Sequence, residues 1–373
     1  MRLPATTTSE EDLEQFREAV RDALADISSS AQVRAAMMSE AGWEASTWRV
    51  LAGQLGLAGL MLPEEHGGSG MGTAEFAVAV EECGAALVCA PLFATSVLAV
   101  PLLLALDDRE ALTKYGPRIA DGSMTATIAL AEDGGRWDLG TVRAQAEQTS
   151  SGWRLTGVKH HVVDGATAGL LLVVARAPDG LGVFAVERGA PGVHATPLAT
   201  LDLTRKMARI DLTDAPATLV GELGAEPAIA AATDVSRALL AAEQTGVAMR
   251  CLNMTVDYAK TRIQFGRPIG QFQAIKQRLA DALIQVESAR SAVYVANRST
   301  GEELARNSRV AAILATEAAV WMTAQTIQLH GGIGFTWEHD AHLYFKRARA
   351  NAFLLGQVSE HVAALGAMLE AIA

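Results

Sequence analysis

The residues best suited to ligand chemistry lie in the stretch YAKTRIQFGRPIGQF, which spans residues 258–272. Arg262 and Phe265 stand three residues apart, so on a helix they share one face near its end. A guanidinium can bind a phosphate through two parallel hydrogen bonds, and an aromatic side chain can cover a ring. The same pattern also fits an amphipathic helix with a solvated arginine, because isolated arginines mostly lie on surfaces. Pro268 is expected to end this helix.

A second stretch, QLHGGIGFTWEHD (328–340), combines an amide with adjacent glycines. Gly331 and Gly332 allow a ligand to approach the backbone closely, because glycine has no side chain. Gln328 lies one helical turn earlier and offers its amide for hydrogen bonding. Adjacent glycines after a helix are also a common way for helices to end, so this motif alone is a weak indication of a binding site.

Three segments of different secondary structure must position these residues. Apolar residues at helical spacing extend to about residue 113, with a proline- and glycine-rich loop at 62–72. From 124 to about 220, short β-rich runs such as LLLVVARA (170–177) alternate with turn residues. Helical spacing returns after Pro227 and continues to the end of the chain.

The chain is therefore expected to be mainly α with a central β domain, of the α+β class. The expected domains are an N-terminal helical domain at 1–122, a middle β domain at 123–225 and a C-terminal helical domain at 226–373.

Composition and charge exclude several classes of protein. Hydrophobic residues make up 50% and charged residues 20% of the chain, which is typical of a globular protein. The net charge of −11 argues against nucleic acid as a partner. No run of about 18 apolar residues occurs, so no membrane span is expected. The few cysteines and the absence of an apolar core near the N-terminus indicate a cytoplasmic protein with reduced thiols.

Three separated stretches resemble, in order and position, those of the acyl-CoA dehydrogenase family of flavoproteins. GLAGLMLPEEHGGSG (56–70) resembles the N-terminal signature of that family, and the other two are the stretches at 258–272 and 328–340. The resemblance covers essentially the whole chain. It implies an N-terminal helical domain, a middle β-barrel or sandwich and a C-terminal four-helix bundle.

The resemblance also implies a cofactor, a substrate and a shared site. Family members bind FAD across a subunit interface and oxidise the Cα–Cβ bond of an acyl-CoA thioester. A carboxylate removes the α-proton while the β-hydride goes to the flavin. By resemblance, the residues that reach into the neighbouring subunit's FAD are Arg262, Phe265, Gln328, Gly331 and Gly332. Arg262 would neutralise part of the pyrophosphate charge, and the glycines would contact the adenosine end.

The catalytic glutamate of the family has no counterpart at either position that the resemblance indicates. The first position holds Leu355, in the stretch ANAFLLGQV, and leucine cannot act as a general base. The second position, on the helix before Arg262, holds Ser236.

The nearest carboxylate to these positions is Glu243, two helical turns beyond Ser236 on the same face. Two interpretations stay open for it. Glu243 is either a catalytic base or a buried carboxylate paired with an arginine such as Arg237 or Arg250.

The β segment departs from the family pattern as well. The stretch that holds flavin and substrate in the family reads AEDGGRWD here, at residues 131–138. A tryptophan and a threonine that hold the flavin in the family are replaced by His161 and Val163. The residues that would serve this chain's own flavin are thus altered, whereas those that would reach a neighbour's flavin are intact.

This asymmetry is similar to that of the α2β2 acyl-CoA dehydrogenases of actinobacterial steroid side-chain breakdown, in which two unlike subunits build each site. The favoured interpretation is a subunit that donates FAD-binding residues to an unlike partner carrying the glutamate. One alternative is a self-sufficient homo-oligomer with Glu243 as base. Others are a non-catalytic scaffold or CoA-thioester-binding subunit, and an oxidase or flavin monooxygenase variant of the fold.

Smaller features have simpler explanations. The adjacent residues His160 and His161 are expected to point to opposite faces of a strand, which disfavours a shared metal. His339 and His342 are interpreted as surface or interface histidines, and KRAR (346–349) as a solvated helix face. The tryptophans are scattered and are interpreted as structural.

Overall fold

The computed structural model describes residues 8–370 and separates into two compact units. Unit 1 contains Arg34–Phe76 and Cys89–Ser236. Unit 2 contains Thr8–Val33, Ala77–Val88 and the chain from Arg237 onward. Both units therefore include parts of the N-terminal helical segment. The domain boundaries predicted after residues 122 and 225 are not tested by this division and stay a prediction.

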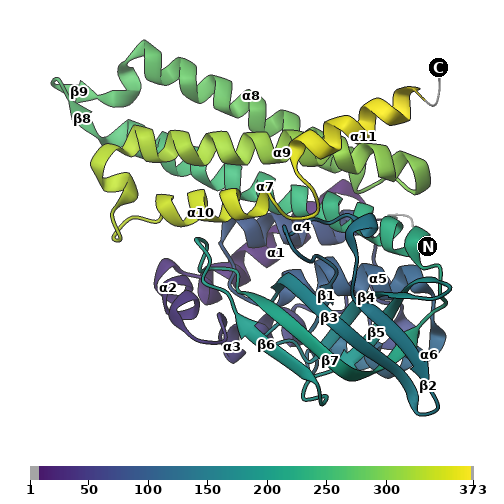
Figure 1. Cartoon of the computed structure of the whole chain (residues 1–373). Helices are drawn as coiled ribbons and strands as arrows, with labels where there is room; N and C mark the ends of the chain where they lie inside the picture. The colour runs from purple at the N-terminus through teal and green to yellow at the C-terminus, as the bar shows by residue number, and fades with distance from the viewer. Residues whose placement is uncertain (1–7, 371–373) are drawn as a thin grey trace. The chain divides into compact units, whose positions relative to one another are not determined.

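Unit 1 contains a sheet of seven strands that closes on itself (Figure 1). The strands are β1 (Ala126–Ala129), β2 (Gln145–Thr149), β3 (Gly152–Val163), β4 (Leu170–Ala177), β5 (Gly180–Glu187), β6 (Val193–Pro197) and β7 (Met207–Val220). Antiparallel pairing runs from β4 through β5, β7 and β3 to β2. β2 then pairs in parallel with β4 at Gln145 and Arg176, which completes a ring. Of the two predicted forms, the domain is therefore a barrel.

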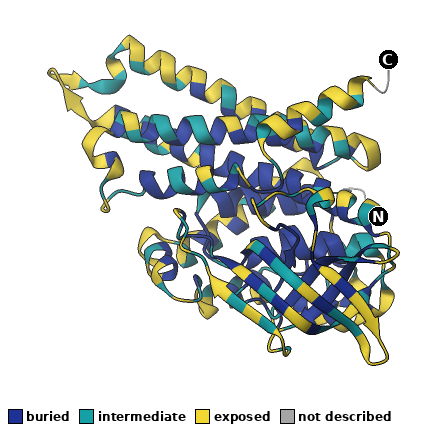
Figure 2. Cartoon of the chain, viewed as in Figure 1, coloured by how far each residue is buried: buried dark blue, intermediate teal, exposed yellow. Residues whose placement is uncertain are grey.

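The barrel interior is filled by the alternating apolar side chains of its strands. Leu155, Phe184 and Ile210 are among its fully buried members, and the Trp153 ring packs on Phe184 with ring centroids 5.2 Å apart. β4 is buried along almost its whole length, in agreement with its continuous apolar sequence (Figure 2). Unit 1 also contains the helices α3 (Ala45–Arg49), α5 (Val100–Leu106) and α6 (Arg109–Ala120). Two π-helical turns lie at Val50–Gln54 and Phe93–Ala99.

Up to residue 370, the regular structure of unit 2 is helical apart from one short hairpin. Its helices are α1 (Glu10–Ile27), α8 (Gln273–Ala296), α9 (Gly301–His330), α10 (Ala341–Asn351) and α11 (Val358–Glu370). Three further helices are shared with unit 1: α2 (Ser30–Met38), α4 (Thr73–Ala85) and α7 (Glu226–Thr261). α9 packs against α8, α10 and α11 (Figure 1). The mainly α protein with a central β domain and a C-terminal helical bundle is thus confirmed.

Helices α4 and α7 cross at two glycines. A Cβ added at Gly84 would overlap the carbonyl oxygen of Glu243, and one added at Gly246 would overlap that of Glu81. The two backbones therefore approach each other more closely than any other residue type would permit. This crossing fixes the positions of Glu81 and Glu243, both of which are buried.

One described helical stretch, Gly301–Phe335, is long and apolar enough to cross a membrane by length and composition. It includes α9, and 44% of its most apolar window is buried inside the structure. A core helix of a bundle meets the same criteria, so this is only weak evidence for a membrane span.

Candidate functional site

The first predicted motif forms a hairpin and not the end of a helix. α7 ends at Thr261, and β8 (Ile263–Gln264) pairs with β9 (Arg267–Pro268) across a turn formed by Phe265 and Gly266. Both turn residues have positive φ, 53° and 78°, as a two-residue hairpin of this type requires. The predictions that Arg262 and Phe265 share a helix face and that Pro268 ends the helix were therefore wrong.

The hairpin presents its side chains to solvent. Phe265 is 91% exposed and makes only an edge-on contact with Phe272, at a centroid distance of 6.2 Å. Arg262 is exposed too, and within residues 8–370 no hydrogen bond or ion pair of its guanidinium is observed. A phenylalanine this exposed, in a strained left-handed conformation, is characteristic of a contact surface and not of a core.

The second predicted motif lies at the C-terminal end of α9. Gln328 is exposed in the last turn of the helix, and Gly331 follows with φ 65°. Gly331 and Gly332 are exposed, and no atom of the chain lies within 4 Å of where their Cβ atoms would be. Both glycines thus leave open space beside the backbone, as close approach of a ligand requires.

The structure brings the two motifs to the same end of the bundle. The Tyr258 ring of α7 stacks on the His330 ring of α9 with centroids 4.3 Å apart. The Tyr258 hydroxyl also donates a hydrogen bond to the His330 carbonyl, at 3.3 Å. Figure 1 shows the β8–β9 hairpin and the turn after α9 at this common end.

Two exposed aromatic side chains follow the glycines of the second motif and were not recognised from the sequence. Phe335 is 70% and Trp337 56% exposed, next to the exposed Ile333. Trp337 had been interpreted as structural. The Lys346 ammonium lies 4.9 Å from the Trp337 ring centroid, so part of the supposed solvated face of α10 is engaged here. The sequence signal for these exposed aromatic residues was the run GIGFTW, in which apolar residues do not recur at helical spacing.

Glu243 is held in a buried ion pair. It is 4% exposed, and Arg347 and Asn351 of α10 each donate a hydrogen bond to its Oε1, at 3.0 Å. The interpretation of a buried carboxylate paired with an arginine is thus confirmed, and the pair involves Arg347, which sequence reasoning did not name. A guanidinium at this distance stabilises the ionised carboxylate, which gives Glu243 a structural role in the bundle interior.

The other two positions considered for a base are also structural. The Ser236 hydroxyl is buried and donates to the Ala232 carbonyl at 2.9 Å. Leu355 is buried with a left-handed φ of 59°, and its carbonyl accepts a hydrogen bond from Arg237 Nε at 3.4 Å.

Charged side chains of both signs lie near the Leu355–Gly356 turn, since the Glu360 carboxylate approaches Gly356 and the Arg237 guanidinium reaches the Leu355 carbonyl. Burial, aided by the Arg237 and Arg309 guanidinium groups, lowers the pKa of His361 to about 4. His361 is buried and reaches the Leu355–Gly356 turn, since a Cβ on Gly356 would meet the imidazole at 2.7 Å. This imidazole is therefore neutral at pH 7.

In the barrel, the stretch 131–138 is held by a buried ion pair. Lys159 is fully buried, and its Nζ lies 2.7 Å from Glu132 Oε1 and 3.1 Å from the Leu130 carbonyl. Glu132 also accepts the backbone N–H groups of Arg143 and Ala144. Burial alone would raise the pKa of Glu132, but these donors outweigh it and lower the pKa. The carboxylate therefore anchors this loop to the barrel wall.

The two adjacent histidines of β3 do not simply alternate between faces. The register of β3 with β7 shifts between Lys159 and Val162, and His161 has a φ of 53°. His160 lies 3.4 Å from Asp133, while the His161 ring packs beside Gly135. His161 thus lies beside the loop at the position where the family pattern has a tryptophan. Val163 has no hydroxyl, whereas the family pattern has a threonine at that position.

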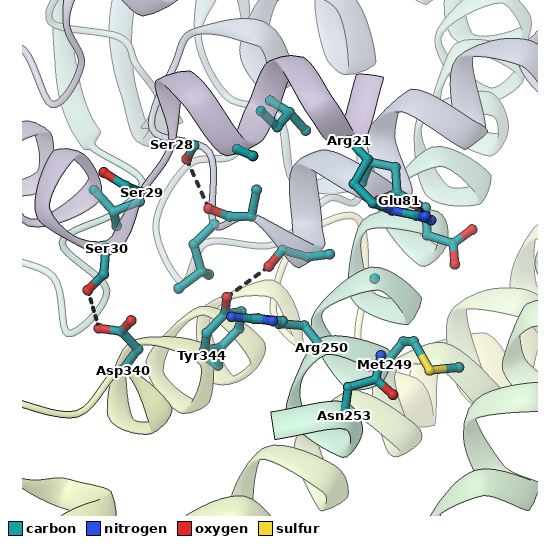
Figure 3. Close-up of a pocket in the computed structure, with 18 of the residues that line it drawn as sticks. Arg21, Ser28, Ser29, Ser30, Glu81, Met249, Arg250, Asn253, Asp340 and Tyr344 are labelled. Carbon is teal, nitrogen blue, oxygen red and sulfur yellow. Dashed lines mark hydrogen bonds and ion pairs between the residues drawn. The ribbon is translucent and has the colours of Figure 1, made fainter. Parts of the chain in front are cut away.

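A groove of about 830 Å³ in unit 2 is lined by α1, α4, α7, α8 and α10 (Figure 3). The charged side chains that line it largely form ion pairs with one another. Arg17 Nη1 lies 3.0 Å from Glu81 Oε2 and 3.0 Å from Glu82 Oε1, and Arg290 Nη2 lies 2.8 Å from Glu81 Oε1. Ser30 donates to Asp340, and Tyr344 donates to the Ala85 carbonyl. Glu243 does not line this groove, and the lining carboxylates Glu81, Glu82 and Asp340 are engaged by Arg17, Arg290 and Ser30.

The remaining sequence features have structural roles. His342 is buried, so its interpretation as a surface histidine was wrong. Between residues 8 and 370, no group of three or more His, Cys, Asp or Glu residues is placed to hold a metal ion. The three cysteines are buried and free of disulfides, as predicted.

Comparison with known proteins agrees with this architecture along nearly the whole chain. Residues 10–123, 127–213 and 224–366 match the N-terminal, middle and C-terminal domains described for acyl-CoA dehydrogenases. A relative from Mycobacterium tuberculosis, acyl-CoA dehydrogenase IpdE2, is 39% identical over 93% of this chain and 94% of its own length.

Two solved complexes are similar in sequence and structure. A variant of the Tcur3481-Tcur3483 steroid ACAD is 33% identical with a TM-score of 0.87, covering 96% of this chain and 98% of that one. The ChsE4-ChsE5 complex from Mycobacterium tuberculosis is 30% identical with a TM-score of 0.88, covering 99% of both chains.

Proposed function

Because the chain belongs to the acyl-CoA dehydrogenase family, we propose that it is one subunit of an FAD-dependent acyl-CoA dehydrogenase whose working site needs an unlike neighbour. This chain donates FAD-binding residues, and the neighbour carries the catalytic glutamate. The two similar complexes named for pairs of proteins support such an α2β2 assembly.

The residues at the end of the bundle fit an FAD contact. Arg262 extends a guanidinium into solvent for a pyrophosphate, and Phe265 presents a ring for stacking. Gln328 and the open backbone at Gly331 and Gly332 suit the adenosine end. When bound, FAD supplies the acceptor for the β-hydride of an acyl-CoA thioester, and the α-proton goes to the neighbour's carboxylate.

One contrast carries the proposal. The candidate base Glu243 is tied to Arg347 in the bundle interior, whereas the residues proposed to contact a neighbour's flavin are exposed. A self-sufficient enzyme needs a base that can reach its substrate, so this contrast disfavours Glu243 in that role.

The substrate proposed is a steroid-derived acyl-CoA thioester. It rests on the similarity to a complex described as a steroid ACAD, at 33% identity over 96% of this chain. The free, buried cysteines support the reducing cytoplasm as the compartment.

The visible absorption spectrum of the purified protein tests the proposal. The chain alone is expected to be colourless, and co-expression with its unlike neighbour is expected to yield a yellow complex with stoichiometric FAD. In that complex, Arg262→Ala should weaken FAD retention, since a charge-assisted phosphate contact is lost. A yellow homo-oligomer of this chain that bleaches on addition of an acyl-CoA would overturn the proposal.

A further inference from the structure

The contact between Tyr258 and His330 joins two segments that are otherwise separate in the chain. Tyr258 lies one turn before Arg262, whose N–H donates to the Tyr258 carbonyl at 2.8 Å. His330 directly precedes Gly331. The stacked rings thus lie between the arginine–phenylalanine hairpin and the glycine turn.

The His330 ring is held by a hydrogen bond and by a ring contact. Its Nδ1 lies 2.7 Å from the Thr326 carbonyl, which can only accept, so Nδ1 carries the proton. The centroid of the His339 ring, in the segment before α10, lies 4.5 Å from that of the His330 ring. One turn deeper, the hydroxyl groups of Thr255 and Thr326 are 3.1 Å apart and connect the same two helices.

From this arrangement we infer that Tyr258 and His330 are positioning residues for the FAD contact made in the neighbouring subunit. They hold the hairpin at a set distance from the glycine turn, so that Arg262 and Gly331 reach one cofactor together. The inference rests on the proposed function and adds to it the residues that align the two halves of the contact. Neither ring needs to touch FAD for this role.

The rings are suited to this task because the segments that they join are largely exposed to solvent. The hairpin residues 263–267 are all exposed, and Gly331, Gly332 and Ile333 are exposed as well. His330, by contrast, is buried. A ring stack of this kind corresponds to roughly a two- to tenfold change in an equilibrium beyond the effect of surface burial.

The test measures the FAD dissociation constant of the complex, by flavin fluorescence on dilution, for variants of this chain. Tyr258→Leu removes both the stack and the hydrogen bond and is expected to weaken FAD binding about tenfold. Tyr258→Phe keeps the stack and is expected to stay within about threefold of the original protein. Tyr294→Leu is the matched control, because Tyr294 is exposed on α8, where its hydroxyl donates to Glu10. It should leave FAD binding unchanged.

A double-mutant cycle with Arg262→Ala separates positioning from general destabilisation. If Tyr258 acts by placing Arg262, Tyr258→Leu should have a smaller effect once Arg262 is absent. Equal effects in both backgrounds, or unchanged FAD binding in Tyr258→Leu, would refute the positioning role. If Tyr258→Leu is insoluble, His330→Leu disrupts the same stack from α9 and should show the same coupling.

Failure of the wider proposal gives a different result. If this chain contributes nothing to FAD binding, Arg262→Ala alone leaves the dissociation constant unchanged. If only the positioning role fails, Arg262→Ala weakens binding while Tyr258→Leu does not.

Discussion

At the scale of single residues, buried carboxylates with arginine partners account for the charged interior of unit 2. Glu243 pairs with Arg347, and Glu81 pairs with Arg17 and Arg290. Sequence reasoning recognised that Glu243 was either a base or a buried ion pair. It could not name Arg347, because the partner lies 104 residues away and packing alone brings it near.

Replacement of Glu243 by glutamine should destabilise the protein without removing a catalytic base. The buried Arg347 guanidinium would lose its counter-charge, which typically costs about 3–5 kcal/mol. The thermal unfolding midpoint of Glu243→Gln should therefore fall clearly, while the folded complex keeps its dehydrogenase turnover. Glu317→Gln, at an exposed position of α9, should leave the midpoint unchanged. Lost turnover with a normal midpoint would instead assign catalysis to Glu243.

A carboxylate introduced at position 355 should not create a working base. Leu355 is buried beside Arg237, and the nearby Arg309 adds positive charge. Leu355→Glu would form an ion pair there, which lowers the carboxyl pKa and weakens its basicity. In a complex whose neighbour lacks its glutamate, Leu355→Glu should not restore flavin bleaching by an acyl-CoA. Restored bleaching would mean that this loop can face substrate.

His361 should make stability depend on pH. Its pKa is lowered to about 4 in the folded chain, whereas an unfolded histidine titrates near 6.5. The unfolded chain therefore binds more protons between these values, so this contribution is complete above pH 6.5 and is lost as the pH falls toward 4. The unfolding midpoint of the original protein should drop across this window. In His361→Gln the drop should be smaller, and identical pH profiles would contradict the assignment.

At the scale of secondary-structure elements, sequence patterns located those strands that are buried. The run LLLVVARA coincides with β4 at 170–177, and the predicted turn at Pro178–Gly180 connects β4 to β5. β2 and β6 were not predicted, because most of their side chains are exposed and carry no alternating apolar pattern. The closure between β2 and β4 could not be predicted either, since it depends on pairing between distant segments.

The end of α7 shows a further limit of local patterns. Helical spacing through Tyr258 suggested that the helix continues to Pro268, but it ends at Thr261. The signal that mattered was Gly266, which permits the two-residue turn with Phe265. The structure places the predicted site residues at one end of the bundle, but the backbone that presents Arg262 and Phe265 was predicted incorrectly. Their role at FAD stays a prediction.

The glycine crossing of α4 and α7 gives a prediction at this scale. Gly246→Ala would force a Cβ into the Glu81 carbonyl and push the helices apart, so the unfolding midpoint should fall. Gly366→Ala, in α11, meets no atom within 4 Å and should leave the midpoint unchanged or raise it, because alanine favours helix by about 1 kcal/mol. Equal midpoints for the two variants would show that the helices can separate at little cost.

At the scale of the whole molecule, the exposed aromatic end of the bundle should decide assembly. Phe265→Asp is expected to abolish co-purification of the unlike neighbour, because it places a charge in an apolar contact. Folding of the chain itself should be unaffected, since aspartate tolerates a left-handed turn position. Met38→Asp, at an exposed position of α2, serves as control. If both variants keep the neighbour, the contact lies elsewhere.

The same aromatic end has a consequence in the cell. A copy of this chain made in excess would expose the side chains of Phe265, Phe335 and Trp337 to solvent, and exposed apolar side chains promote aggregation. Chaperones and proteases act on such orphan subunits. If the proposed unlike neighbour covers this end of the bundle, the steady-state amount of this chain is expected to fall when the neighbour is deleted.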